Sequence, residues 1–251
     1  MDIDRIAEIV ETVTVESRDD GNVFTETGRA DVIASLLFES GYHLLFSGNL
    51  CYVFSKRNFQ PGDEVVLISS HIDTVYKECF CREDGDFLTG TFDNSLTNAA
   101  VVGNMLEGVF ADNVIVAFTG DEEVDSEGAL EVYRTLHHAG LKVKFAVVTE
   151  VTNEGWDKEC AFTVENDLGV GIFNGRKLAE VLDEYQGEFD YIHNAEPDES
   201  WDYNALNIAC LTLCVPVQGD MHSEGGVFAR KLLLPRYCEA LCDIVGCVSE
   251  I

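Results

Sequence analysis

The chain has 251 residues, of which 46% are hydrophobic and 25% are charged, as is typical of a soluble globular protein with a substantial core. Its 16 Lys and Arg residues against 46 Asp and Glu residues give a formal net charge of −30. Because nucleic acids and anionic membranes are bound through Lys and Arg, this charge argues against both as partners. It favours cations such as metal ions, basic peptides or free amino termini, although solubility alone explains it equally well.

The amino terminus, residues 1–6, has neither the basic nor the apolar region of a secretory signal. No apolar run approaches the roughly 18–20 residues that span a bilayer. Most of the nine cysteines lie inside apolar stretches, a placement typical of reduced, buried thiols in a cytosolic protein. We therefore expect a cytoplasmic protein.

Apolar residues recur with helical period near the amino terminus, and the first predicted elements are two helices at residues 2–14 and 26–40. Three strand-like runs follow, at 42–46, 50–55 and 65–69. Helices and strands then alternate, with a helix at 96–110, a strand at 114–118, a helix at 126–139 and a strand at 143–149.

Beyond Glu150 the pattern becomes rich in strands, predicted at 160–165, 169–173 and 208–213, with helices at 177–185 and 234–245. The alternation predicts an α/β fold with a mixed, mostly parallel β-sheet and helices on both faces. Since no linker or repeat interrupts the pattern, residues 1–251 are expected to form a single catalytic domain.

Polar residues that can bind metal follow several of the predicted strands. His71 and Asp73 come directly after an apolar strand, on the same side of an extended chain, so Asp73 can orient the His71 imidazole. Asp93 precedes a helix, where it is either a helix cap or a metal ligand. Taken alone, each of these motifs has an ordinary structural explanation.

The acidic run Asp121-Glu122-Glu123 ends the strand at 114–118. Adjacent carboxylates repel one another unless a cation or a helix amino terminus offsets the charge. Because neighbouring side chains point in different directions, one carboxylate can bind a metal while the other acts as a general base.

Glu150 ends the strand at 143–149, and His222 lies in a loop after the strand at 208–213. With His71, Asp93 and Glu123, these residues could meet at one edge of the sheet. Two histidines and three carboxylates suit Zn²⁺, with Mn²⁺ or Co²⁺ as substitutes. Five ligands exceed what one tetrahedral zinc needs and fit two divalent metal ions.

In its motifs and their order, the chain resembles the co-catalytic zinc exopeptidase superfamily of aminopeptidases, carboxypeptidases and amino-acid deacylases; the matching residues are His71-x-Asp73, Phe92-Asp93-Asn94, Gly120-Asp121-Glu122-Glu123, Glu150 and His222. The resemblance implies that Asp93 bridges two metals, with Asp93-Asn94 a cis peptide. His71 and Glu150 would complete one metal's ligands, and Glu123 and His222 the other's. Asp73 would orient His71, and Glu122 would be the general base.

The chain departs from that superfamily in three places. Many members insert a satellite domain between the positions of Glu150 and His222, and the short interval here predicts its absence. Glu at position 150, where aminopeptidases tend to have Asp, is more typical of carboxypeptidases and deacylases. Tyr76 replaces a frequent proline.

These features predict a metal-dependent hydrolase of peptide or amide bonds, most simply an exopeptidase acting on small peptides. A carboxypeptidase or a deacylase of N-acyl amino acids remains an alternative on the same scaffold. Two alternatives to an enzyme remain. One is a non-catalytic metal-binding or regulatory relative, and the other is a structural domain whose acidic residues only keep it soluble.

Overall fold

The computed structural model describes residues 1–15, 27–38, 40–76, 78–169 and 175–250. The described residues contain seven α-helices: α1 (Ile3–Val13), α2 (Thr27–Leu37), α3 (Ser95–Glu107), α4 (Glu127–His138), α6 (Gly175–Asp183), α7 (Glu199–Ala205) and α8 (Leu234–Ser249). Two short 3₁₀ turns also occur, η1 (Trp156–Lys158) and η2 (Lys231–Leu233).

The strands belong to one 11-stranded sheet. They are β1 (His43–Ser47), β2 (Cys51–Ser55), β3 (Glu64–His71), β4 (Cys81–Asp84), β5 (Phe87–Gly90), β6 (Val114–Thr119), β7 (Lys142–Thr152), β8 (Phe162–Leu168), β9 (Phe189–Tyr191), β10 (Ala209–Gly219) and β11 (Val227–Arg230). Their order is β1-β2-β6-β3-β7-β10-β11-β5-β4, and β8 pairs with both β10 and β9.

The four central strands, β6, β3, β7 and β10, run parallel to one another. The strands on either side, β2 next to β6 and β11 next to β10, are antiparallel. This mixed sheet with a parallel centre confirms the α/β class. Because all the parallel strands end at the same edge, the residues that follow them are brought close together.

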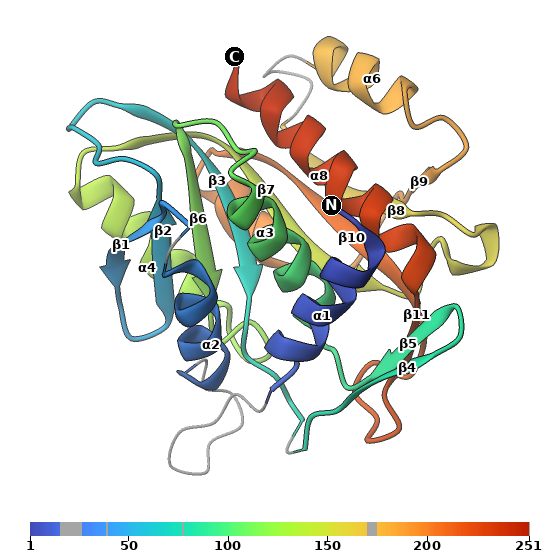
Figure 1. Ribbon diagram of the computed structural model, residues 1–251. Coiled ribbons are helices and arrows are strands. Elements are labelled where there is room, and N and C mark those ends of the chain that lie inside the picture. Colours follow the sequence, from blue (N-terminus) through green and yellow to red (C-terminus); the bar gives the residue numbers. More distant parts are fainter. Residues whose placement is uncertain (16–26, 39, 77, 170–174, 251) are drawn as a thin grey trace.

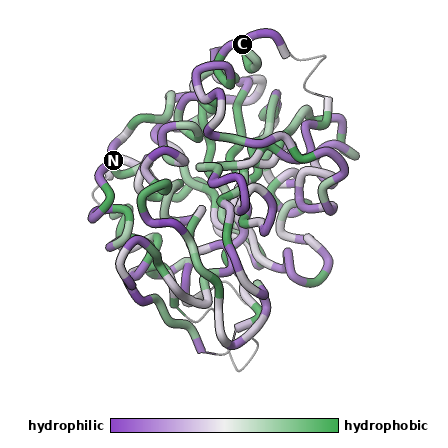
Figure 2. The backbone as a smooth tube through the Cα atoms, turned by 90° about the vertical axis from the view of Figure 1, so that its right-hand side faces the viewer, coloured by the Kyte–Doolittle hydropathy of each residue, from purple (hydrophilic) through white to green (hydrophobic). Residues whose placement is uncertain are grey.

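Helices cover both faces of the sheet. Helices α1, α3 and α8 lie over one face (Figure 1) and pack on strand residues such as Val66 and Ile68. Helices α4 and α7 bury Val65 and Leu67 on the opposite face. The strands are buried on both sides and therefore read as continuous apolar runs. Figure 2 shows hydrophobic residues gathered inside the molecule and hydrophilic residues around them.

Most predicted elements lie within a few residues of their predicted positions. Helix α1 begins where Asp2 accepts a hydrogen bond from the Arg5 amide at 2.8 Å, as a helix amino terminus requires. The sequence pattern missed β4, β5, β9, α7 and β11, and it predicted too short a strand at β10. The strand expected at 169–173 falls almost wholly outside the described residues. Among the described helices, none is long and apolar enough to cross a membrane.

Candidate metal centre

Three of the predicted motifs meet at the carboxyl edge of the parallel strands. His71 ends β3 beside Thr119 of β6, and Ser70 lies beside Thr149 of β7. The acidic run after β6 and Glu150 near the end of β7 therefore flank His71. Strand order alone accounts for this convergence.

The His71 ring is buried and surrounded by carboxylates. Its Nδ1 lies 3.2 Å from Asp73 Oδ1, and its Nε2 lies 3.0 Å from Glu150 Oε2 and 3.8 Å from Asp93 Oδ1. Burial lowers the pKa of His71, but Glu150 and Asp73 more than offset this and hold the pKa well above its ordinary value. Asp73 also accepts a hydrogen bond from the Glu123 amide at 3.2 Å, so it links the two motifs and is placed to orient the ring.

Two asparagines at the start of α3 hold the ends of the strands in place. Asn98 Nδ2 donates to the His71 carbonyl at 2.9 Å. Asn94 Nδ2 donates to the carbonyls of His71 at 3.2 Å and Thr149 at 2.9 Å. Because these bonds join β3 and β7 to the segment that carries Asp93, they fix the relative positions of the candidate ligands.

Asp93 is buried, and its Oδ2 has no hydrogen-bond partner among the described residues. A buried carboxylate oxygen without a partner is costly unless a cation binds it. The residue has a left-handed backbone with φ of 49°, a conformation that Asp tolerates better than most residues. The expected cis peptide at Asp93-Asn94 is wrong: the described chain contains no cis bond, and the chain turns here through the positive φ of Asp93.

Glu122 and Glu123 follow β6 in a loop that rests on the start of α4. A Cβ atom added to Gly128 of α4 would lie 2.3 Å from the Gly120 carbonyl oxygen, so only glycine permits this close approach. Burial, with Glu150, Glu199 and Asp73 as neighbours, raises the pKa of Glu122 to about 8. Burial and Asp93 raise the pKa of Glu123 to about 9.

The candidate ligand atoms form two groups that share His71. One consists of His71, Glu122 and Glu150, and the other of His71, Asp93 and Glu123; within each group the atoms lie within 4.8 Å of one another. These acidic and imidazole side chains, with an unpartnered Asp93 oxygen, are nitrogen and oxygen donors that could hold a divalent metal ion. The described geometry also places Glu122 near enough to be a ligand rather than a base.

His222 stands apart from these groups. Its Nε2 lies 3.5 Å from Glu123 Oε2, and its side chain is 59% exposed. Neither group of ligand atoms in the described chain includes it. The structure therefore brings His71, Asp93, Glu122, Glu123 and Glu150 together and leaves His222 at the rim.

Sequence reasoning missed a further buried acid, Glu199, at the start of α7. It is 1% exposed, and its Oε2 accepts a hydrogen bond from Ser69 Oγ at 2.7 Å. Burial raises the pKa of Glu199 to about 7. The one signal in the sequence is Asp198, whose side chain accepts from the Ser200 amide and begins the helix.

The raised pKa values of Glu122 and Glu123 predict that the metal-free protein loses stability as the pH rises. The ordinary value is 4.5, and the folded values are about 8 and about 9, so between these limits the folded protein binds more protons than the unfolded chain. Stability then falls with increasing pH. We expect the melting temperature in chelator to drop steadily between about pH 5 and pH 9.

The double variant Glu122→Gln/Glu123→Gln isolates this effect from the general repulsion of a strongly acidic protein. Its melting temperature should fall less steeply over the same pH range, and added Zn²⁺ should raise the melting temperature of the unmodified protein at pH 8. Equal slopes for the two proteins would contradict the assignment of the raised pKa values to this pair.

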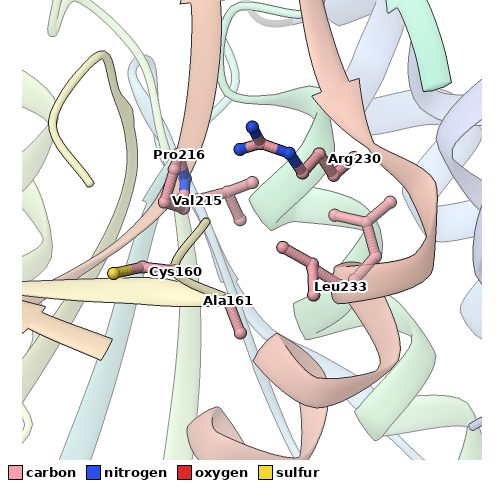
Figure 3. A pocket seen from close by; sticks show the side chains of 7 residues that line it. Cys160, Ala161, Val215, Pro216, Arg230 and Leu233 are labelled. Atoms are coloured by element: carbon pink, nitrogen blue, oxygen red, sulfur yellow. The ribbon is translucent and has the colours of Figure 1, made fainter. Parts of the chain in front are cut away.

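A cavity of about 590 Å³ opens beside these residues and is lined in part by His71, Asp93, Glu122, Glu123 and Glu150. A volume of this size suits a small organic ligand. A second hollow, between β10, β11 and η2 (Figure 3), measures about 10 Å³, room for about one water molecule. Its Arg230 already stacks on Trp156, with the guanidinium carbon 3.7 Å from the ring centroid. The first cavity, which the candidate ligands line, is therefore the candidate substrate site.

No protein-family model matches the sequence, and no curated protein matches it. Solved structures do share its fold. The aminopeptidase PepT of Bacillus cereus is 11% identical with a TM-score of 0.70, over 99% of both chains. The YxeP protein of Bacillus subtilis, a dinuclear metal-binding peptidase, is 9% identical with a TM-score of 0.71, over 99% of this chain and 98% of that one.

A third similar structure is described as an endoglucanase from Thermotoga maritima; it is 11% identical with a TM-score of 0.68, over 96% of this chain and 98% of that one. At such identities the likeness concerns the fold alone, and one fold hosts different reactions. The chain thus has the α/β fold found in dinuclear metallopeptidase structures, as its motifs predicted.

Proposed function

We propose that this protein is a metal-dependent hydrolase of peptide or amide bonds, most simply an exopeptidase on small peptides. The observation that carries the proposal is the pair of ligand groups that share His71, together with the unpartnered Asp93 Oδ2, in the lining of a cavity of about 590 Å³. The fold shared with metallopeptidases supports it.

His71, Asp93, Glu123 and Glu150 would hold the metal ions, with His222 joining Glu123 from the rim. Metals bound there would polarise the scissile carbonyl and stabilise the charge that develops on its oxygen. Zn²⁺ suits these nitrogen and oxygen ligands, and Mn²⁺ or Co²⁺ could replace it.

Glu122 would take a proton from the attacking water and pass it to the leaving amine. Its carboxylate lies in one group with His71 and Glu150 and lines the cavity where a substrate would bind. Asp73 would hold the imidazole of His71 in the tautomer that leaves Nε2 free to bind.

A carboxypeptidase or deacylase remains the second candidate, because Glu150 stands where aminopeptidase relatives tend to have Asp. A panel of aminoacyl-anilides, small peptides and N-acetyl amino acids, assayed side by side with metal-loaded protein, separates these activities. Hydrolysis at only the free amino end of peptides would support the aminopeptidase.

Metal dependence is expected to be complete. Elemental analysis should find about two divalent metal ions per chain after reconstitution with Zn²⁺. Removal by a chelator should abolish hydrolysis, and added metal should restore it. A protein that neither retains nor rebinds metal, or that hydrolyses its substrate equally well in chelator, would rule out the proposed chemistry.

A further inference from the structure

The cavity beside the metal centre continues away from it, and its far part is acidic. Beyond the candidate ligands, four more acids line it: Glu154, Glu165, Glu196 and Asp198. In the described part of the chain no Lys or Arg lines this cavity. A substrate that enters it therefore meets carboxylates of the candidate metal centre and further carboxylates beyond it.

Strand register places Glu165 at a definite distance from the metal centre. On neighbouring strands, Glu150 of β7 lies beside Cys214 of β10, and Cys214 lies beside Thr163 of β8. Two strand spacings separate Thr163 from Glu150 by about 10 Å, and two residues along β8 add about 7 Å in the strand direction for Glu165. Glu165 follows two residues after Thr163 and so lies on the same face of the sheet as the candidate ligand Glu150.

The Glu165 carboxyl group lines the cavity yet is only 8% exposed. It accepts a hydrogen bond at 2.7 Å from the hydroxyl of Thr163, and no ion pair to it occurs among the described residues. Asp198 lies next to it: Thr212, which pairs with Glu165 across the strands, donates to Asp198 Oδ2 at 2.7 Å. Burial first and then Asp198 raise the pKa of Glu165.

Glu165 is buried and Asp198 is half-buried, and in the described chain both accept hydrogen bonds from neutral donors alone, so a cation that enters the cavity would offset their negative charge. Within the described residues, neither Glu165 nor Asp198 belongs to a group of ligand atoms close enough to hold a metal ion. An organic cation at the end of a flexible chain suits this place better than a metal ion. The flexible chain can reach from the metal centre to Glu165 and Asp198.

We propose that Glu165 and Asp198 bind the positively charged side chain of the substrate's amino-terminal residue, so that the protein is an aminopeptidase for peptides that begin with Lys or Arg. This inference rests on the proposed function. With the scissile carbonyl at the metal centre, a side chain with three or four methylene groups extends along the cavity and brings its charged end to Glu165.

The same charges disfavour the alternative substrates. A carboxypeptidase or a deacylase must bind a free carboxylate close to the reacting carbonyl, and such a group needs a cationic or amide partner. The lining does include the amides of Asn153 and Asn194, but its eight carboxylates outnumber them, and like charges at this range repel. An amino-terminal residue brings only positive charge into the cavity and leaves the rest of the peptide outside.

The test compares anilides of lysine and norleucine, whose side chains have similar length but differ by one ammonium group, on the metal-loaded full chain. We expect kcat/KM for lysine to exceed that for norleucine by about 10- to 100-fold, the effect of one charge-assisted hydrogen bond. Glu165→Gln should bring this ratio close to one. Glu184→Gln, which removes an exposed acid outside the cavity lining, should preserve it.

The outcomes separate this inference from the proposed function. Hydrolysis of both anilides with no preference for lysine, or a preference that survives Glu165→Gln, overturns the subsite and leaves the hydrolase intact. Hydrolysis of N-acetyl amino acids in place of anilides also overturns the subsite and leaves the hydrolase intact. No metal-dependent hydrolysis of any substrate overturns the proposed function itself. If Glu165→Gln instead loses a bound metal ion on elemental analysis, the acidic pair is a metal site and the subsite is excluded.

Discussion

Replacement of Glu122 by Gln is expected to reduce kcat by about 10²- to 10⁴-fold, the usual contribution of a positioned general base. The substitution keeps the shape of the side chain and removes only its ability to take a proton. If Glu122 is the base, metal content should stay at about two ions per chain, and KM should change little. Steady-state kinetics and elemental analysis on the same preparation give both values.

The metal content decides between two roles that the geometry allows for Glu122. Its carboxylate lies in one ligand group with His71 and Glu150, so a ligand role predicts that Glu122→Gln loses an ion together with activity. Asp121→Asn is the matched control, since it neutralises the neighbouring acid, which belongs to neither ligand group in the described chain. An active Glu122→Gln enzyme would exclude both roles.

The centre of the fold could be predicted because its signals are local. Each of β3, β6 and β7 is an apolar run buried on both faces, and each is followed directly by a polar motif. Parallel strands end at one edge of a sheet, so His71, Glu123 and Glu150 had to lie near one another once the α/β class was inferred. Their residue types then indicated a metal site.

The rest of the cavity could not be predicted, because it is built by contacts between distant segments. Helix α7 has only seven residues, too few for a clear helical period. Glu199 is recognisable as buried only when Ser69, 130 positions earlier in the chain, is seen to bond it. Glu165 alternates with Phe162 and Val164 as a solvent-facing residue would, yet the loop that ends at Asp198 helps to enclose it.

His193 and His222 show the same limit of short sequence patterns. His193 has no motif context in the sequence, yet it lines the cavity. His222 does have a motif context, and it too lines the cavity from an exposed position, outside both groups of ligand atoms in the described chain. Where an exposed loop comes to lie over a sheet depends on long-range packing, and no short pattern encodes it.

Asp93→Asn is expected to have opposite effects on stability with and without metal. The substitution removes one negative charge from the centre of a buried acidic cluster and keeps the side-chain shape. Without metal, less repulsion acts on Glu123, whose pKa is raised in part by Asp93, so the variant should melt at a higher temperature than the unmodified protein above about pH 7.

With metal, the order should reverse, because a neutral amide binds a divalent cation much more weakly than a carboxylate does. Affinity for at least one ion should fall by more than about 100-fold, beyond the loss usually seen when a residue that merely orients a ligand is replaced, and hydrolysis should fall with it. Thermal denaturation in chelator and in Zn²⁺ measures both effects on one sample. Asp112→Asn, an exposed acid before β6, should shift neither temperature. A variant that is less stable under both conditions would mean that Asp93 supports the fold through its own contacts, and that the unpartnered oxygen of its carboxylate does not await a cation.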